Sequence, residues 1–340
     1  MKKRTLGRSA ATLLAALTVV ASPAAASAST PGGQPGRFDE YVALGDSYTS
    51  GPLIPWLRLD SLACFRSTGN YPSRLAAKIR PHRFVDASCG GADTQDMTGA
   101  QAPGTPPQLN ALSERTDLVT MGIGGNDFNS FGELTSTCAA LRNQNPTGSP
   151  CRDRFEADGG TELARRMTAV ADRITAVVGE IRARSPHAKV VLVGYPRIIP
   201  PQGYCPDIIP FADGDYAFYD EWEQKLNGAV SQAAHRTHAD FVDTYTPSLG
   251  HDACATGGAA WINGMRFSLV AAPMHPFGSA MAGEAALIAD RLAGKRTSPG
   301  TLDRITSETT TREQAAMSNA TPDELAHQRA GADRYAHPAR

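Results

Sequence analysis

Ser47 is the first residue of the chain whose setting suits a nucleophile. It stands in the triplet Gly45-Asp46-Ser47, directly after the apolar run of residues 41–44. This pattern predicts a short buried strand that ends in a tight turn and presents one serine hydroxyl. The triplet alone is also ordinary turn chemistry, because all three residue types are common in turns. A catalytic role for Ser47 therefore depends on what the rest of the chain supplies.

A serine nucleophile needs a base and donors for the oxyanion, and three later segments contain such groups. They are Cys89-Gly90-Gly91-Ala92-Asp93-Thr94, Gly124-Gly125-Asn126-Asp127 and Met274-His275-Pro276-Phe277-Gly278. In this order, and together with the Gly-Asp-Ser triplet, the segments resemble the sequence blocks of the SGNH, or GDSL, hydrolase family. The resemblance extends from residue 41 to about residue 292.

The resemblance implies a role in ester hydrolysis for one residue of each block. Ser47 would attack the ester carbonyl and His275 would act as its base. The oxyanion would be held by the N–H groups of Ser47 and Gly91 and by the side-chain amide of Asn126. A glycine lets the backbone approach a ligand closely, and an asparagine amide is a neutral donor. Gly90 remains an alternative to Gly91.

The base and its partner need a choice among several residues. His275 is preferred to its rival His251 because it lies in a Pro-rich loop that leads into the last predicted helix, as in the family's final block. The family often has an aspartate three residues before this histidine, where this chain has Ala272. We predict that the main-chain carbonyl of Ala272 accepts the Nδ1–H, as in some secreted lipases that the chain resembles. Asp127 and Asp252 are the two carboxylates that would otherwise serve.

The N-terminus has the pattern of a secretory signal peptide. Basic residues are followed by an apolar stretch at 10–21 and by Ala26-Ser27-Ala28. This predicts a signal peptide over residues 1–28, cleaved after Ala28. The apolar stretch is shorter than the roughly 20 residues that span a bilayer. We therefore expect a secreted protein without stable membrane insertion.

Six cysteines in an exported chain predict three disulfides, and the sequence alone leaves their pairing open. Pairing of neighbours along the chain is the simplest scheme, and it is what the resembling secreted lipases show. A zinc site is the competing interpretation, but there is no Cys-x-x-Cys pair, and His235 and His238 lack nearby cysteines. The neighbour pairs would be Cys64 with Cys89, Cys138 with Cys151, and Cys205 with Cys254.

Apolar runs and amphipathic segments alternate along the chain. The alternation predicts an α/β fold, a three-layer αβα sandwich with a central, mostly parallel sheet, whose sites gather at the carboxyl ends of the strands. A flexible leader is expected at residues 29–36, the hydrolase domain at 37–296, and a disordered tail at 297–340 because large apolar residues become few. Strands are expected at 41–44, 84–85, 118–123, 190–193 and 241–242, and helices at 71–79, 163–181, 216–238 and 279–292.

The net charge of −1 and the 20% of charged residues give no large field of either sign. Nucleic acid is therefore not expected as a partner. We expect a monomer that needs no metal and no cofactor, and whose partner is a small-molecule or lipid ester.

The main hypothesis is a secreted lipase or esterase, and two alternatives stay open. A carbohydrate acetyl esterase would share the fold and the residues, and a non-catalytic binding protein on the same scaffold would explain the missing aspartate. Apolar segments at 52–57, 198–201 and 208–211 follow predicted strand ends, where they would either line an acyl groove or form the cores of loops. A groove favours acylglycerols, fatty-acid esters or phospholipids as substrates.

Overall fold

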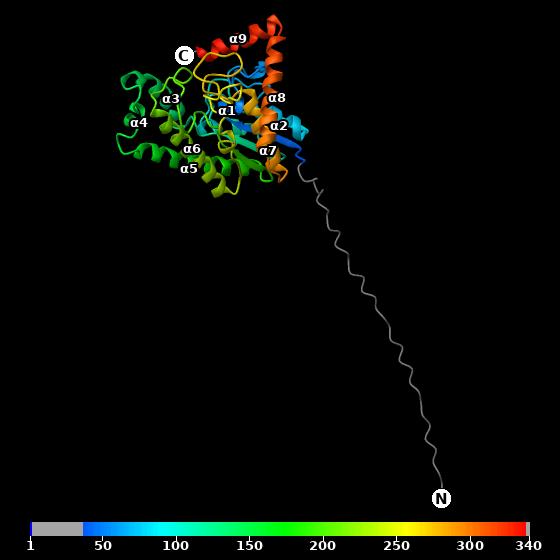
Figure 1. The fold of residues 1–340 in the computed structure, drawn as a ribbon. Coiled ribbons are helices and arrows are strands. Elements are labelled where there is room, and N and C mark those ends of the chain that lie inside the picture. The colour runs from blue at the N-terminus through cyan, green and yellow to red at the C-terminus, as the bar shows by residue number, and fades with distance from the viewer. Residues whose placement is uncertain (2–36, 338–340) are drawn as a thin grey trace. The chain divides into compact units, whose positions relative to one another are not determined.

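The computed structural model of the chain describes Met1 and residues 37–337 (Figure 1). The predicted signal peptide and leader therefore lie outside the described residues, apart from Met1. The centre of the fold is a five-stranded sheet with the strand order β2-β1-β3-β4-β5, in which all neighbours are parallel. The strands are β1 (Glu40–Gly45), β2 (Arg83–Asp86), β3 (Leu118–Gly122), β4 (Lys189–Val193) and β5 (Asp240–Val242). All five expected strands are confirmed.

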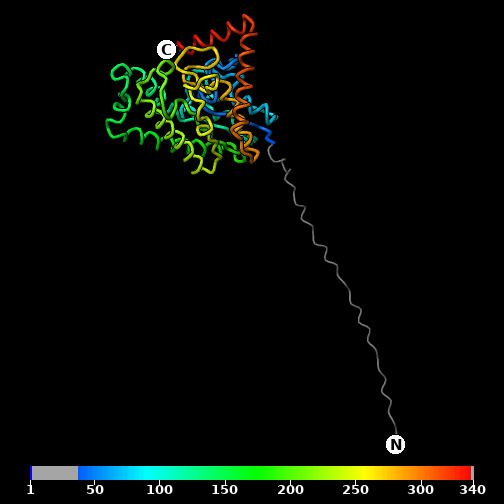
Figure 2. Tube along the Cα trace, viewed as in Figure 1, coloured from blue at the N-terminus to red at the C-terminus, as the bar shows by residue number. Residues whose placement is uncertain are grey.

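Helices cover both faces of the sheet, which confirms the three-layer αβα architecture. Side chains alternate along β1, because successive residues of a strand point to opposite faces. Tyr41 and Ala43 pack in one core, and Val42 and Leu44 pack in the other. The first core includes α2 (Tyr71–Ile79) and α7 (Gly278–Leu292), and the second includes α5 (Thr161–Arg184) and α6 (Asp215–Thr237). The tube in Figure 2 follows the same chain path.

Shorter helices lie in the connections between these elements. No helix in the described part of the chain combines the length and apolarity that crossing a bilayer requires. The short helices are α1 (Ser47–Ser50), α3 (Ser130–Leu141) and α4 (Pro150–Phe155), with 3₁₀ turns at Leu59–Ser61, Thr94–Met97, Gln108–Ala111, Asp127–Asn129, Arg142–Gln144 and Thr246–Ser248.

The six cysteines form three disulfides between neighbours along the chain. The bridges join Cys64 to Cys89, Cys138 to Cys151 and Cys205 to Cys254. The pairing implied by the resemblance is confirmed. Cys64–Cys89 matters most for the site, because it ties the loop after α1 to the Gly90-Gly91 segment.

The expectation of a disordered tail is wrong for most of its length. Two helices follow α7, namely α8 (Pro299–Ser318) and α9 (Pro322–Ala336), and α9 crosses the end of the domain near its loops (Figure 1). Both begin at side-chain caps, since Ser298 accepts from the N–H of Thr301 and Thr321 forms a capping box with Glu324. The composition was a poor guide because, apart from Leu302, the fully buried residues of these helices are small or polar.

Candidate active site

At Gly45, the last residue of β1 and two residues before the predicted nucleophile, the backbone accepts only glycine. Gly45 has φ of +147°, and a Cβ there would lie 2.2 Å from Thr49 Oγ1 and 2.5 Å from the Gly122 carbonyl oxygen. The turn allows the Asp46 carboxylate to accept the Tyr48 N–H at 2.8 Å and so to cap α1. Ser47 is the first residue of α1, and its own N–H has no partner within residues 37–337. That N–H is available to a ligand.

A buried tyrosine that the sequence analysis missed connects this turn to the Gly-Gly-Asn loop. The Tyr195 hydroxyl donates to Asp46 Oδ2 at 2.6 Å and accepts the Gly125 N–H at 2.9 Å. Burial raises the pKa of the Asp46 carboxyl to about 7, and the hydrogen bond from Tyr195 opposes that rise. Tyr195 lies two residues beyond the end of β4 at Val193, so its position after a strand end was the available signal.

The amide of Gly91 is the free donor in its loop. The N–H of Gly90 donates to the Cys64 carbonyl at 2.9 Å, and the N–H of Ala92 donates to the Cys89 carbonyl at 3.1 Å. The N–H of Gly91 has no partner in the described part of the chain, and φ of +79° at this residue favours glycine. Of the two glycines considered, Gly91 has the geometry of a ligand donor.

Asn126 is held with one amide hydrogen to spare. Its Nδ2 donates to the Ala92 carbonyl at 2.9 Å, which joins the Gly-Gly-Asn loop to the Gly91 loop and leaves a second N–H. The neighbouring Asp127 is fully buried and ties the same loops, because it accepts from Thr94 N–H and Oγ1 at 3.1 and 2.6 Å and pairs with Arg173 at 2.8 Å. Asp127 therefore orders the loops, and none of its hydrogen bonds goes to His275.

The histidine of the last block packs beside the nucleophile turn. The His275 ring lies 5.2 Å from the ring of Tyr48, and the Tyr48 hydroxyl donates to the Met274 carbonyl at 2.6 Å. Residue 48 follows Ser47, so the structure brings the two loops together. No direct hydrogen bond joins Ser47 to His275 among the described residues, and such contacts often tighten only when substrate binds.

The carbonyl that holds the imidazole is that of Pro273, so the prediction of Ala272 is wrong. His275 Nδ1 lies 2.7 Å from the Pro273 oxygen. The Ala272 oxygen instead accepts the main-chain N–H of His275 at 3.2 Å and the Nδ2 of Asn263 at 3.2 Å. The Ala272 carbonyl closes the turn at 272–275 by accepting the His275 N–H. The Pro273 carbonyl is therefore left to accept from the imidazole ring.

The surroundings keep His275 neutral. Burial lowers the pKa of its imidazole to about 4, and the hydrogen bond to Pro273 opposes that fall. Because the carbonyl at Nδ1 can only accept, Nδ1 carries the proton and Nε2 is the basic atom. The site thus contains a neutral imidazole with a main-chain acceptor in place of a carboxylate.

The rival residues lie in other surroundings. His251 stacks on Trp261 and its Nδ1 lies 2.8 Å from the Ala259 carbonyl, while Asp252 accepts the Cys254 N–H at 2.9 Å. Within residues 37–337, no group of three His, Cys, Asp or Glu side chains is placed to hold a metal ion.

Helix α9, which the sequence analysis left outside the domain, reaches the site. The ring of Tyr335 lies 6.0 Å from that of His275, and its hydroxyl is 3.5 Å from Nδ1. Ala332 and Tyr335 pack in one apolar cluster with loop residues from both sides of the site. The loop members of that cluster are Leu53, Leu57, Phe65, Leu269 and Ala272.

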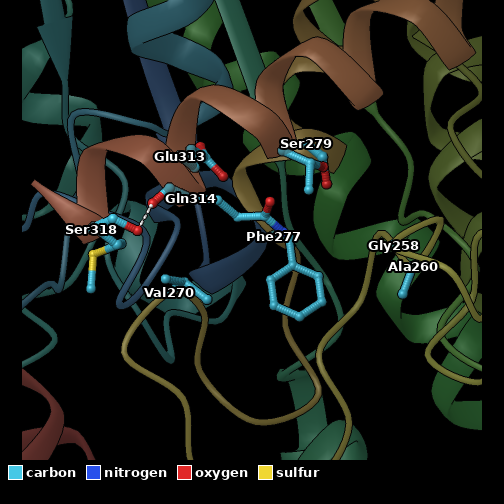
Figure 3. A pocket seen from close by; sticks show the side chains of 10 residues that line it. Gly258, Ala260, Val270, Phe277, Ser279, Glu313, Gln314 and Ser318 are labelled. Atoms are coloured by element: carbon cyan, nitrogen blue, oxygen red, sulfur yellow. Dashed lines mark hydrogen bonds between the residues drawn. The ribbon is translucent and has the colours of Figure 1, made fainter.

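The other apolar segments considered for an acyl groove are parts of the core. Ile198, Ile199, Ile209 and Phe211 are buried in the cluster that includes α5 and α6, so they form the cores of their loops. A cavity of about 530 Å³ lies elsewhere, between α8 and the loop around His275 (Figure 3). Its lining is mostly apolar and includes Val270, Phe277 and Met317.

Comparisons with known proteins agree with this architecture. The model of the GDSL-like Lipase/Acylhydrolase family matches residues 43–277. Lipase 2 of Streptomyces coelicolor is 40% identical over 241 residues, which are 70% of this chain and 80% of the relative. The crystal structure of phospholipase A1 from Streptomyces albidoflavus has a TM-score of 0.62 at 27% identity, covering 76% of this chain and 99% of that one. The extracellular lipase of Streptomyces rimosus has a TM-score of 0.56 at 27% identity, covering 74% and 97%.

Proposed function

The chain belongs to the GDSL-like lipase/acylhydrolase family and is an ester hydrolase, and we propose that it hydrolyses long-chain carboxylic esters through an acyl-enzyme on Ser47. The observation that carries the proposal is the orientation of His275. Its Nδ1 is engaged by the Pro273 carbonyl while its ring lies against Tyr48, next to the nucleophile. This leaves Nε2 as the atom that accepts the serine proton.

The proposed reaction has two halves with the same proton carrier. Ser47 Oγ attacks the ester carbonyl carbon as its proton passes to His275 Nε2, and the imidazolium then protonates the leaving alcohol. Water repeats the sequence on the acyl-enzyme, releases the acid and restores Ser47. In both halves the oxyanion accepts hydrogen bonds from the N–H groups of Ser47 and Gly91 and from the free amide hydrogen of Asn126.

The proposed substrates are acylglycerols, fatty-acid esters or phospholipids. The similar proteins include lipases and a phospholipase A1. The apolar cluster and the apolar cavity beside the His275 loop both suit an acyl chain more than a sugar. A panel of esters from acetyl to oleoyl, with one phospholipid, tests this. Turnover should rise with chain length, and a preference for acetyl esters would contradict the proposal.

We propose that the enzyme acts outside the cell. Three disulfides form readily only in an oxidising compartment, and one similar structure is an extracellular lipase. N-terminal sequencing of protein from the culture medium should find a chain that begins after Ala28. Retention of residues 1–28 on protein that stays with the cells would contradict export.

A covalent probe tests the nucleophile directly. An alkylphosphonate ester should label the folded wild-type protein at Ser47, as located by mass spectrometry of its peptides. The Ser47→Ala variant is the control and should take no label. A folded wild-type protein that stays unlabelled would remove the acyl-enzyme mechanism.

A further inference from the structure

Helix α9 covers an apolar surface that adjoins both catalytic residues. We define the acyl surface as Leu53, Leu57, Phe65, Leu269 and Ala272, which pack together beneath the helix. Leu53 lies on the loop that follows Ser47, and Ala272 lies in the turn that leads to His275. We propose that the acyl surface binds the substrate's acyl chain and that α9 is a hinged cover, which must leave it before a long chain can reach Ser47. This inference rests on the proposed function.

The face of α9 that meets the acyl surface is built for close approach. Gln328, Ala332 and Tyr335 recur at helical spacing and point toward the loops. Gly331 lies between them, and a Cβ at this glycine would be 2.1 Å from Leu57 Cδ1. The helix therefore fits the acyl surface only without a side chain at residue 331.

The attachment of α9 consists of a few breakable contacts. Gln328 Nε2 donates to the carbonyls of Leu53 and Leu269 at 2.6 and 2.9 Å, and Gln328 Oε1 accepts the Leu57 N–H at 3.4 Å. The other side-chain hydrogen bonds come from His327 and Tyr335. No ion pair joins α9 to the rest of the described chain. A segment with so few links opens at a lower free energy than the core.

The helix can also move as a unit. Its N-terminal donors are satisfied within the helix by Thr321 and Glu324, so leaving the domain would not cost that cap. Helix α8 is held more firmly, because Glu313 pairs with Arg74 of α2 at 2.6 Å and Leu302 is buried against the domain. The short connection at 319–321 between the two helices is therefore the proposed hinge.

The catalytic pair is largely buried in the closed form, and a long acyl chain must in addition reach the acyl surface beneath α9. Ser47 is 7% exposed and His275 is 4% exposed. The reactive form for a long ester is then the minor one with α9 displaced, and the observed rate falls with its population. A long acyl chain favours opening because each methylene gains by leaving water for the acyl surface, whereas an acetyl group gains little. Helix α9 lies outside the family match, which ends at residue 277.

A matched pair of substitutions in α9 tests the cover in the full-length protein. Gly331→Leu should raise the helix propensity yet prevent seating on Leu57, whereas Ala330→Leu adds the same side chain on the exposed face. The readout is the rate at which a long-chain alkylphosphonate and its methyl analogue label Ser47. We expect Gly331→Leu to label with the long-chain probe about tenfold faster than wild type. The methyl probe and the Ala330→Leu control should stay within about twofold.

Two further variants keep the test decisive if Gly331→Leu does not fold. Gln328→Ala removes the donor of the Leu53 and Leu269 carbonyls and should also accelerate the long-chain probe. Leu57→Cys combined with Gly331→Cys should form a disulfide that holds α9 in place and slows labelling by the long-chain probe. Reducing this disulfide should restore the labelling rate, with wild type in the same reductant as the control.

The outcomes separate the cover from the hydrolase function. Labelling of Ser47 at a rate that no α9 variant changes would overturn the cover and leave the hydrolase proposal standing. Equal acceleration of both probes, or slower labelling in Gly331→Leu, would overturn the assignment of the acyl surface. Absence of labelling by either probe in every folded variant would instead overturn the proposed function.

Discussion

The two halves of the proposed catalytic site are held by different kinds of structure. The oxyanion half, with Ser47, Gly91 and Asn126, lies at the carboxyl ends of neighbouring parallel strands. Buried side chains connect its loops, most directly Tyr195 between Asp46 and the Gly125 amide. The base half, with His275, lies on the long connection between β5 and α7, outside the sheet.

In the base half, main-chain hydrogen bonds and the covering helix α9 hold the His275 loop in place. In the oxyanion half, strand pairing holds the loops. The Asn263 N–H donates to the His275 carbonyl at 2.9 Å, and the Asn263 side chain donates to the carbonyls of Ala271 and Ala272. Oxyanion donors act best when they are fixed before the reaction, whereas a base must also let substrate in and product out. We therefore expect the oxyanion half to be rigid and the base half to be more mobile.

The largest effect should come from removing either reacting side chain. Ser47→Ala and His275→Ala should each abolish measurable ester hydrolysis, because one proton transfer needs both groups. The double variant should lose little more than either single one, since residues that act as a unit are not additive. Turnover of the three variants with one soluble ester checks this, with thermal melting as the control for folding. Losses that multiply would mean that the two halves act in separate steps.

Removing one donor of the oxyanion half should cost less but still act on the chemical step. Asn126→Ala should lower kcat by roughly a hundredfold to a thousandfold with little change in KM, because the oxyanion forms only in the transition state. Steady-state kinetics over a range of ester concentrations measures both constants. A rise in KM alone would make Asn126 a residue that binds the ground state.

The link that makes the oxyanion half rigid can be cut without touching the donors. Tyr195→Phe removes the hydroxyl and leaves Asp46 Oδ2 and the Gly125 N–H without their partner. The free energy of unfolding should fall by about 1 to 3 kcal/mol, as expected for unsatisfied buried groups. We expect kcat to fall by about tenfold as the donors lose their alignment. Tyr204→Phe, on an exposed ring, is the matched control, and equal effects of the two substitutions would count against the link.

The sheet, and the placement of Ser47, Gly91 and Asn126 together at its edge, could be predicted from sequence because local patterns encode them. Continuous apolar runs mark strands that are covered on both faces, and glycine with a polar residue follows the runs at 41–44 and 118–123, at the edge where sites form. The role of Tyr195 could not be predicted, because a single tyrosine after a strand belongs to no recognisable sequence motif.

The base half was predicted less well because tertiary contacts decide it. His275 could be placed by its block, but the choice between the Ala272 and Pro273 carbonyls depends on how a turn closes. The docking of helix α9 on the domain was missed because small residues such as Gly331 and Ala332 allow close packing without an apolar pattern. Composition alone cannot show that a polar helix is bound to a domain.

The pH dependence of kcat/KM tests whether water is excluded from His275. Burial lowers the pKa of His275 to about 4, so its neutral, basic form should persist well below the usual value near 6.5. The facing titratable groups are Tyr48 and Tyr335, whose pKa values burial raises, so they stay neutral in this range. We expect kcat/KM at pH 5.5 to stay within about twofold of its value at pH 7.5, where an ordinary histidine would lose about tenfold. Gln328→Ala should raise the pKa at which kcat/KM falls at low pH, because water then reaches His275. If kcat/KM of the wild-type enzyme already fell with a pKa near 6.5, the site would be open to water.

The smallest effect should come from the two carboxylates considered as alternative partners of His275. Asp252→Asn keeps an oxygen for the Cys254 N–H, and nothing links Asp252 to the imidazole, so kcat should stay within about twofold of wild type. Asp127→Asn should lower stability, because it weakens the bonds to Thr94 and Arg173, but the remaining folded enzyme should keep its pH profile. Turnover per phosphonate-titrated site separates the two effects. A loss of roughly ten-thousandfold per site in either variant, as when a triad carboxylate is neutralised, would identify that residue as the true partner of His275 and displace the Pro273 carbonyl.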